Sequence, residues 1–346
     1  MLLKKNIRHL SLENIKNFLA ENNEKAFKAK QIYEWLWKKS VTDFDQMTNI
    51  SKNLRQLLSD NFSLDTVKVN SVFKSADGTI KSSFLLKDGQ IIEGVLIPSH
   101  NRITACISTQ VGCALGCKFC ATGKIGFIRN LETEEIYDQV VLISKQAEEY
   151  YQKKLSNIVY MGMGEPMLNY DNVIKSIKII TSETGLAISP HRITISSAGI
   201  TKMIKKFADE NLKVNLAISL HSANDNIRSS IMPVNKKNPL NDLIEALKYY
   251  YSKTNNRLRI EYLLLKDVND SLIDAKELLV FCKNFPVKIN IIEYNPNDGS
   301  DFQKSDEKRL KTFTDLLKEK NLIVNIRRSR GKDIDAACGQ LANKIM

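Results

Sequence analysis

Three cysteines in the first half of the chain have a spacing that is typical of iron–sulfur chemistry. Cys113, Cys117 and Cys120 follow the pattern Cys-x3-Cys-x2-Cys, in a loop that also holds Gly112 and Gly116. Three thiolates at this spacing could ligate three irons of a [4Fe-4S] cluster and leave the fourth iron without a protein ligand. S-adenosylmethionine (SAM) could chelate that open iron, and an electron from the cluster could then cleave its sulfonium bond.

Two other interpretations of this cysteine group are less favoured. A structural zinc site usually has a fourth cysteine or histidine nearby, in paired Cys-x2-Cys knuckles, and the sequence has no such residue next to the motif. A chance grouping of buried cysteines does not account for the spacing or for the two glycines of the loop. The sequence therefore favours an iron–sulfur cluster.

Small and polar residues at the ends of predicted strands are candidate cofactor contacts. In the run from Met161 to Pro166, Gly164 would let the backbone approach a ligand and Glu165 could accept hydrogen bonds from an ammonium group. An ordinary turn from strand to helix is the alternative. His221 could be a core residue, a metal ligand or a SAM contact, and its position after an apolar strand favours the last. The other candidates are Ser196, Ser219, Leu220 and Asn295.

Three further cysteines lie outside the motif. Cys106 belongs to a predicted strand, and Cys338 lies among small residues in the tail. Cysteines in such places are more often inert than reactive, but the small neighbours of Cys338 would leave it room to move, as a shuttling nucleophile requires. Cys282 falls in a predicted helix and is interpreted as structural.

After residue 102, apolar strands alternate with amphipathic helices. This alternation predicts an α/β fold with a parallel sheet, either curled into a barrel or left open. The candidate site residues then fall at the carboxyl ends of the strands, where barrel enzymes have their active sites. The expected strands are 103–108, 157–163, 193–197, 214–220, 259–265, 288–294 and 323–328, and the expected helices are 133–150, 171–181, 201–209, 240–252, 271–284 and 305–320.

The first hundred residues have a different organisation. Residues 11–61 are expected to form three short helices, with Ser11 and Ser51 as caps of the first and third. From about residue 66 to residue 98 the pattern becomes strand-like, and Asp77-Gly78 and Asp88-Gly89 are strong hairpin signals. These residues predict a small three-stranded extension that leads into the main domain.

The net charge of the chain indicates which kind of partner it binds. The 346 residues carry a formal net charge of +12, which favours a polyanion such as nucleic acid, although a lysine-rich solvated surface is the alternative. The run Arg327, Arg328, Arg330 and Lys332 suits phosphate contact.

The cysteines and the hydropathy indicate the compartment. Six unevenly placed cysteines do not fit a secreted disulfide scaffold. No stretch approaches the roughly 18 apolar residues of a membrane span, and residues 1–12 lack the features of a signal peptide. We therefore expect a cytoplasmic protein.

The motifs together resemble the RlmN family of radical SAM enzymes, which methylate C2 of adenine in ribosomal and transfer RNA. The resemblance implies a partial (β/α)6 barrel over residues 102–346 with a catalytic tail. It also implies a helical, RNA-binding accessory domain over 1–62 and a β-hairpin extension over 63–101. The matching segments are 29–35, 112–123, 129–131, 161–166, 219–221, 295–296 and 337–341.

The resemblance further implies a mechanism that consumes two SAM molecules per turnover. One SAM methylates Cys338, and a 5′-deoxyadenosyl radical from the second takes a hydrogen atom from that methyl group. The carbon radical adds to C2 of the adenine, a base at the position of Glu93 removes the C2 proton, and Cys106 attacks Cys338 to release the product and leave a disulfide. The positions that match SAM contacts of the family are Gly164, Glu165, Ser196, Ser219, Leu220, His221 and Asn295.

The resemblance also implies the partners, and it leaves two alternatives open. The expected substrates are 23S ribosomal RNA, at the peptidyl-transferase centre, and transfer RNA, at an anticodon-loop adenine. The expected protein partner is an electron donor such as flavodoxin, and the enzyme is expected to be a monomer. A related resistance methyltransferase acts at C8 of the same adenine and shares the cluster and both reactive cysteines. A non-catalytic RNA-binding protein with a cluster or zinc is the other alternative.

Overall fold

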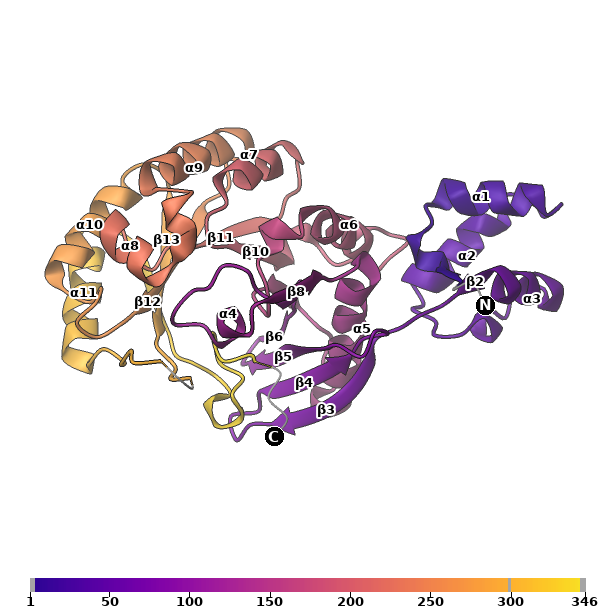
Figure 1. The fold of residues 1–346 in the computed structure, drawn as a ribbon, viewed down its shortest axis with the longest axis horizontal. Coiled ribbons are helices and arrows are strands. Elements are labelled where there is room, and N and C mark those ends of the chain that lie inside the picture. The colour runs from indigo at the N-terminus through magenta and orange to yellow at the C-terminus, as the bar shows by residue number, and fades with distance from the viewer. Residues whose placement is uncertain (1–3, 298–299, 343–346) are drawn as a thin grey trace.

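The N-terminal lobe is a small group of three helices at one end of the molecule (Figure 1). The computed structural model describes residues 4–297 and 300–342 of the chain. Ser11 and Ser51 cap α1 and α3 through bonds to the backbone N–H groups of Asn14 and Leu54, as their side-chain chemistry predicts. The elements of this lobe are β1 (Lys5–Asn6), α1 (Leu12–Glu21), α2 (Lys28–Trp37), α3 (Lys52–Asn61) and β2 (Phe62–Ser63).

The main body is built on a ten-stranded sheet, and the predicted parallel strands are confirmed within it. The strand order is β14-β13-β12-β11-β10-β9-β6-β5-β4-β3, and every neighbouring pair from β6 to β14 is parallel. The order is linear, so the sheet is an open, partial barrel with edge strands β14 and β3. The parallel strands are β6 (Arg102–Cys106), β9 (Asn157–Tyr160), β10 (Ile193–Ser197), β11 (Asn215–Ser219), β12 (Leu258–Leu264), β13 (Val287–Glu293) and β14 (Ile323–Arg327).

The predicted three-stranded extension continues this sheet. β3 (Lys68–Lys74), β4 (Ile80–Leu85) and β5 (Ile91–Ser99) are antiparallel, and β5 pairs with β6 of the barrel. The two connections turn at Gly78 and Gly89, whose φ angles of 86° and 82° lie in the left-handed region that glycine tolerates. The domain boundaries given above stay a prediction.

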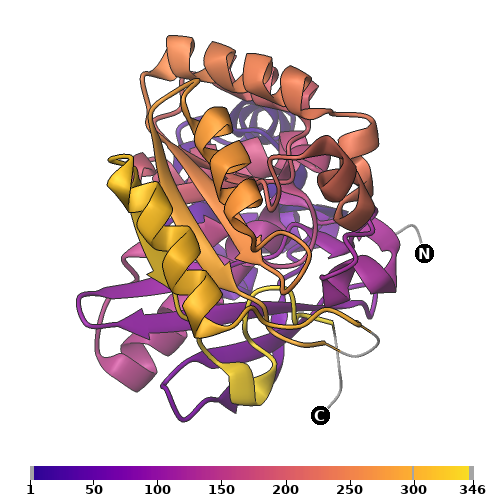
Figure 2. The ribbon, with the colours of Figure 1, turned by 90° about the vertical axis from the view of Figure 1, so that its left-hand side faces the viewer.

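Helices cover the outer face of the parallel sheet (Figures 1 and 2). Each has one apolar face, and those faces join the barrel strands in a continuous core. Four short elements of the main body were not predicted, namely α4 (Ala121–Ile125), β7 (Gln110–Gly112), β8 (Phe127–Asn130) and α8 (Asp225–Ile231). The predicted helices are α5 (Thr133–Tyr151), α6 (Tyr170–Thr181), α7 (Thr201–Asp209), α9 (Leu240–Thr254), α10 (Leu272–Cys282) and α11 (Glu307–Glu319).

Helix α5 joins the N-terminal lobe to the barrel. Arg8 forms a buried ion pair with Asp138, with 2.6 Å between Nη1 and Oδ1. The rings of Trp37 and Tyr137 pack edge to face at 5.0 Å, and the Tyr137 hydroxyl donates to the Trp37 carbonyl. Buried contacts of this kind fix the lobe against the barrel. Across the ranges that the structure describes, no helix is long and apolar enough to span a membrane.

Candidate active site

One cavity lies at the carboxyl ends of the parallel strands and gathers most of the predicted site residues. It brings Cys338 of the tail together with Cys106 at the end of β6, although 231 residues of chain separate them. Three predicted residues are placed outside its lining, namely Glu93, Leu220 and Asn295. The predicted residues that do line it are Cys106, Cys113, Cys117, Cys120, Gly164, Glu165, Ser196, Ser219, His221 and Cys338.

The cysteine loop is shaped by the small hairpin of β7 and β8. The N–H of Cys113 donates to the carbonyl of Gly126 at 2.8 Å, which closes the loop at its base. A Cβ atom on Gly112 would lie 1.8 Å from that same carbonyl oxygen, and its φ is 74°. Only glycine fits there. The residue before the first cysteine therefore sets the path on which all three thiols are presented.

The three thiols fit a cluster better than a single ion. Two sulfurs bound to one zinc can be at most about 4.6 Å apart, since each Zn–S bond is about 2.3 Å. Among the described residues, the only group of three possible ligands within 4.8 Å of one another is His9, Glu132 and Glu134. The cysteine sulfurs are therefore too far apart to share one zinc. Ligands on three different irons of a cubane do not have to meet.

Electrostatics also indicates that the cysteines require bound cations. Burial, together with the charges of Glu165 and Cys120, raises the pKa of Cys113 to about 11, against a hydrogen bond from the Leu115 backbone. Burial raises the pKa of Cys117 still higher, and the other two thiols of the motif contribute to the rise. Such thiols ionise only when a metal displaces their protons. The chemistry of this donor set fits a [4Fe-4S] cluster.

Glu165 is a buried carboxyl group at the edge of the cavity. Its two oxygens accept from the N–H groups of Met167 at 3.0 Å and Ala198 at 2.8 Å. Burial raises its pKa to about 7, against the effect of these bonds. In the described part of the chain, no lysine, arginine or histidine pairs with Glu165. An ammonium group brought by a ligand would supply the missing cation, so the site fits SAM.

The glycines beside Glu165 also pack closely against the segment that follows β6, and their predicted approach to a ligand stays a prediction. A Cβ atom on Gly162 would lie 2.7 Å from the backbone of Ile107, and one on Gly164 would lie 2.6 Å from the side chain of Gln110. Both glycines thus allow the β9 loop to pack against the segment that follows β6. Their lack of side chains serves this contact between loops, and Glu165 is placed by it.

The remaining predicted SAM contacts lie at the ends of β10, β11 and β13. The hydroxyls of Ser196 and Ser219 are 3.4 Å apart in the cavity wall. Nδ1 of His221 accepts from the N–H of Leu263 at 2.9 Å, so Nε2 carries the proton. Burial, and then the charge of Arg228, lower the pKa of His221 to about 3, so the ring is neutral. Its φ of 58° is unusual for a residue other than glycine.

Leu220 and Asn295, two of the predicted SAM contacts, lie outside the cavity lining and contact neighbouring segments instead. The Leu220 side chain is fully buried in the core. Its backbone N–H donates to the backbone carbonyl of Glu261, and its carbonyl accepts from Nε of Arg228. Nδ2 of Asn295 donates to the carbonyl of Cys338 at 3.4 Å. The structure therefore brings Asn295 to the tail and leaves Leu220 beneath the cavity wall.

The two outlying cysteines share the cavity with an arginine that the sequence did not assign to it. Cys106 is buried and Cys338 is exposed, and both thiols are free. Burial and the nearby Cys338 raise the pKa of Cys106 to about 12, whereas Arg327 lowers it. Nη1 of Arg327 is 3.7 Å from Oε2 of Glu261, a buried oxygen that makes no hydrogen bond. The Arg327 guanidinium therefore favours the thiolate form of Cys106.

The rest of the basic run forms ion pairs with neighbouring carboxylates at the protein surface. Arg328 and Lys332 both pair with Glu293, and Arg328 also contacts Glu307. Arg330 lies 4.0 Å from Asp77. The expected phosphate contact by this run stays a prediction. Its charges are used mainly to fasten the segment after β14.

The tail is fixed to α4, which follows the cluster loop, after Cys338 and to the turn between β3 and β4 before it. The carbonyl of Gly339 accepts from the N–H of Ala121 at 2.8 Å, and the carbonyl of Leu341 accepts from the Thr122 hydroxyl at 2.6 Å. Upstream, Asp333 accepts from Ser75 at 2.6 Å. These bonds hold the neighbours of Cys338 while its side chain stays exposed.

Glu93, the predicted base, is buried behind the cavity. Its Oε1 is 3.3 Å from Nζ of Lys81, and each side chain is 2% exposed. Its Oε2 accepts from the N–H of Ala342 at 2.9 Å. In this structure the carboxylate is therefore held by a lysine and by the tail.

The buried pair of Lys81 and Glu93 gives a stability prediction. Lys81→Met leaves an uncompensated buried carboxylate, which is expected to cost about 3 kcal/mol in free energy of unfolding. The double variant Lys81→Met/Glu93→Gln is expected to recover most of that loss. The measurement is denaturant unfolding of the cluster-free protein.

The exposed pair of Lys87 and Asp65 provides the matched control. Its side chains are 54% and 27% exposed, so Lys87→Met is expected to cost less than about 1 kcal/mol. Equal losses for Lys81→Met and Lys87→Met would contradict a buried charge pair.

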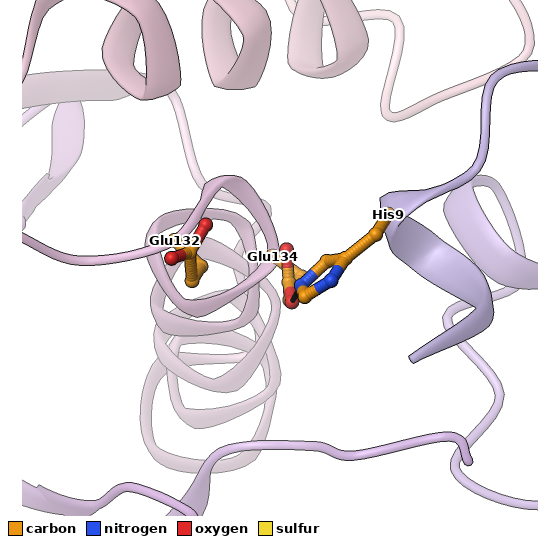
Figure 3. A group of neighbouring side chains, drawn as sticks. All are labelled: His9, Glu132 and Glu134. Atoms are coloured by element: carbon orange, nitrogen blue, oxygen red, sulfur yellow. Dashed lines mark hydrogen bonds and ion pairs between the residues drawn. The ribbon is translucent and has the colours of Figure 1, made fainter. Parts of the chain in front are cut away.

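The group of His9, Glu132 and Glu134 does not require a metal (Figure 3). Figure 3 shows His9 reaching from the N-terminal lobe to Glu134 at the start of α5. Its Nε2 is 2.6 Å from Oε1 of Glu134, and Nδ2 of Asn6 donates to the same oxygen at 3.2 Å. The bond to Glu134 raises the pKa of His9. The group is explained as an ion pair between the lobe and the barrel.

Comparisons with known proteins agree with this geometry. A model of the ribosomal RNA large subunit methyltransferase N-terminal domain matches residues 5–64, and a model of the radical SAM superfamily matches residues 107–279. A "probable dual-specificity RNA methyltransferase RlmN" from Cytophaga hutchinsonii is 57% identical, covering 99% of this chain and 93% of the relative. The protein of the same description from Flavobacterium johnsoniae is 51% identical, with 99% and 98% covered.

A solved structure matches over nearly the whole length. The crystal structure of a radical SAM methyltransferase from Sphaerobacter thermophilus has a TM-score of 0.92 and 38% sequence identity, covering 98% of this chain and all of that one. The radical SAM superfamily uses a [4Fe-4S] cluster and SAM, the two groups that the cysteine loop and Glu165 fit. The chain therefore belongs to the RlmN family of radical SAM RNA methyltransferases.

Proposed function

We propose that the chain methylates C2 of an adenine in 23S ribosomal RNA, at the peptidyl-transferase centre, and of an adenine in the anticodon loop of transfer RNA. The observation that carries the proposal is the meeting of Cys338, Cys106 and the three motif cysteines around one cavity. Adenine C2–H is neither acidic nor electrophilic, so polar methyl transfer would face a prohibitive barrier. A cavity that joins a cluster to a free nucleophilic thiol offers a radical route around it.

The free thiols act in a fixed order in this proposal. The Cys338 sulfur forms a bond to the methyl carbon of one SAM as the methyl–sulfonium bond breaks. When bound, the cluster and a second SAM supply the 5′-deoxyadenosyl radical that removes a hydrogen atom from this methyl group. The carbon radical on Cys338 then adds to C2 of the adenine. The radical adduct gives up the C2 proton and one electron, which would return to the cluster, and a closed-shell thioether joins Cys338 to the RNA. Cys106 attacks the Cys338 sulfur, a disulfide forms as the sulfur–carbon bond breaks, and the released carbon takes up a proton.

Glu93 is the proposed acceptor of the C2 proton. It lies behind the cavity, and its Oε2 accepts from the N–H of Ala342. For Glu93 to reach the adenine, the end of the tail must therefore shift and free this oxygen. Movement of the tail would also carry Cys338 from the SAM side of the cavity toward Cys106.

The partners of the enzyme are proposed on charge and on family. The net charge of +12 supports binding to RNA through its phosphates, and the N-terminal lobe is the proposed accessory contact. Six free cysteines fit a cytoplasmic enzyme, and a monomer that takes electrons from a donor such as flavodoxin is proposed on family alone.

The test is nucleoside mass analysis of unmodified ribosomal and transfer RNA after anaerobic incubation with the reconstituted enzyme, SAM and a reductant. We expect 2-methyladenosine in both RNAs. Finding 8-methyladenosine would keep the chemistry and reassign the position to C8. A protein with a proven cluster and SAM cleavage but no methylated adenine would overturn the proposed substrate.

Glu165 makes SAM binding depend on pH. Its pKa is about 7 without a ligand, and an ammonium group binds the ionised carboxylate more strongly than the neutral acid. SAM affinity is therefore expected to rise from pH 6 to pH 8. Glu165→Gln should weaken binding at pH 8 by about tenfold or more, because a hydrogen bond to a charged group is lost, and should flatten the pH dependence.

Equilibrium binding to the reconstituted enzyme gives this measurement. Glu210→Gln is a suitable control, because Glu210 lies on the protein surface and pairs with Lys178. An unchanged pH dependence in Glu165→Gln would remove Glu165 from the ammonium site.

A further inference from the structure

A fully buried arginine lies behind the cavity, on the short helix α8 that the sequence did not predict. Arg228 is 0% exposed and does not line the cavity. Its Nε donates to the Leu220 carbonyl at 3.0 Å, and its Nη2 donates to the carbonyls of Ala198 at 2.7 Å and Ser219 at 3.3 Å. Its Nη1 donates to Oδ1 of Asn235 at 2.6 Å. The guanidinium thus joins the ends of β10 and β11 with neutral acceptors only.

The charge of Arg228 has no carboxylate partner among the described residues within ion-pair distance. Asp225, on the same helix, is exposed, and its Oδ1 accepts from Asn235 at 2.8 Å and from the N–H of Leu240 at 3.0 Å. Burial lowers the pKa of Arg228 to about 10, so the group stays protonated at neutral pH. An unpaired buried cation is costly, and carbonyls could be satisfied by neutral donors. The retained charge therefore calls for a nearby negative group.

The cysteine loop would hold such a negative group on the side of α8 that faces the cavity. Helix α8 packs on that loop, because the N–H of Lys118 donates to the Ile231 carbonyl at 3.0 Å. Phe119 packs edge to face on His221, with 4.9 Å between the ring centroids. Ile231 and Met232, which follow Arg228 by three and four residues, pack in one apolar cluster with Phe119, Cys117 and Cys120. The helix that carries the guanidinium is therefore in direct contact with the cysteine loop.

We propose that Arg228 is a built-in counter-charge that stabilises the reduced form of the cluster. The inference rests on the proposed function, because it requires the cluster on the three motif cysteines. Reduction transfers one electron from an external donor to the cluster, which becomes more negative by one charge. A fixed cation in a buried setting stabilises that extra charge. Arg228 therefore raises the reduction potential and makes the electron needed for SAM cleavage easier to deliver.

The experiment is a potentiometric titration of the reconstituted holoenzyme with dithionite, followed by electron paramagnetic resonance of the reduced cluster. In Arg228→Gln, which keeps polar donors but removes the charge, we expect about a tenfold lower ratio of reduced to oxidised cluster at a given potential. That ratio corresponds to a shift of about −59 mV for a one-electron couple. Arg228→Lys keeps the charge and is expected to titrate close to the unaltered enzyme.

A second variant changes the field with the opposite sign. Asp225→Asn keeps the Oδ1 acceptor but removes a negative charge that acts on Arg228, so the potential should rise, by less than the fall in Arg228→Gln because Asp225 is exposed. This variant tests the proposal even if Arg228→Gln does not fold. Unchanged potentials in the folded variants, or equal falls in Arg228→Gln and Arg228→Lys, would show a structural role only and overturn the inference. Iron and sulfide contents are measured first, because a protein that assembles no cluster would instead contradict the proposed function.

Discussion

Replacing Cys338 by alanine is expected to reduce RNA methylation to the background rate while the cluster still assembles. Cys338 is exposed, lines the cavity and lies outside the three-cysteine loop. Its neighbours Gly339 and Leu341 are fixed to Ala121 and Thr122 by backbone carbonyls, so loss of one thiol should leave the tail in place. Without that sulfur the methyl group has no carrier.

The measurement combines iron and sulfide analysis, SAM cleavage and nucleoside mass analysis of the same preparation. Cys282→Ala is the matched control, because Cys282 is buried in α10 away from the cavity. It is expected to cost about 1 kcal/mol of stability and no activity. Loss of the cluster in Cys338→Ala alone would make Cys338 a ligand and contradict its role as methyl carrier.

The strong hydrophobic periodicity of the long strands and helices made the barrel predictable from the sequence. Short elements without such a pattern were not predicted. Strands such as β12 and β13 have buried apolar residues at alternate positions, which is the period of a strand. Helix α8 has seven residues, and its sequence has no extended apolar stripe. It is held by tertiary contacts, among them the bonds of Arg228 to strand ends. Helices of this length depend on packing more than on propensity.

The site divides in the same way into local and long-range parts. The cysteine motif and Glu165 were found because their spacing or context is local. Arg327 was assigned to phosphate, because a linear run of cations does not reveal that Glu293 holds Arg328 and Lys332 while Arg327 turns inward. Alternation along β14 was the available signal, since Arg327 and Arg328 must point to opposite faces.

Glu93 shows a further limit of sequence reasoning. The residue is where the resemblance to the family places it, but the sequence does not show its partner Lys81 or the bond from Ala342. These contacts depend on the pairing of β4 with β5 and on the path of the tail. Whether Glu93, the proposed base, can reach a substrate therefore depends on the position of the tail.

In Cys106→Ala, the expected result is a covalent adduct between RNA and Cys338 that accumulates to about one per enzyme. Methylation of Cys338, hydrogen abstraction and addition to the adenine do not use Cys106 in the proposed sequence, whereas release does. Cys106 is buried at the end of β6. No other described thiol outside the cluster motif lines the cavity with Cys338, so none is available to replace Cys106 in the release step. Denaturing gel electrophoresis with labelled RNA detects the adduct, and mass analysis of the digested adduct locates it at Cys338.

The double variant Cys106→Ala/Cys338→Ala is the control that separates this adduct from adventitious crosslinks, and it should yield none. The pKa of about 12 for Cys106 adds a second expectation. Release requires the thiolate, which is scarce at neutral pH when the pKa is this high, so release by the unaltered enzyme should accelerate as the pH rises. Normal turnover by Cys106→Ala would exclude Cys106 as the resolving thiol. An adduct in that variant together with pH-independent release by the unaltered enzyme would keep its role and mean that the cavity, with Arg327 in its lining, delivers the thiolate only after RNA has bound.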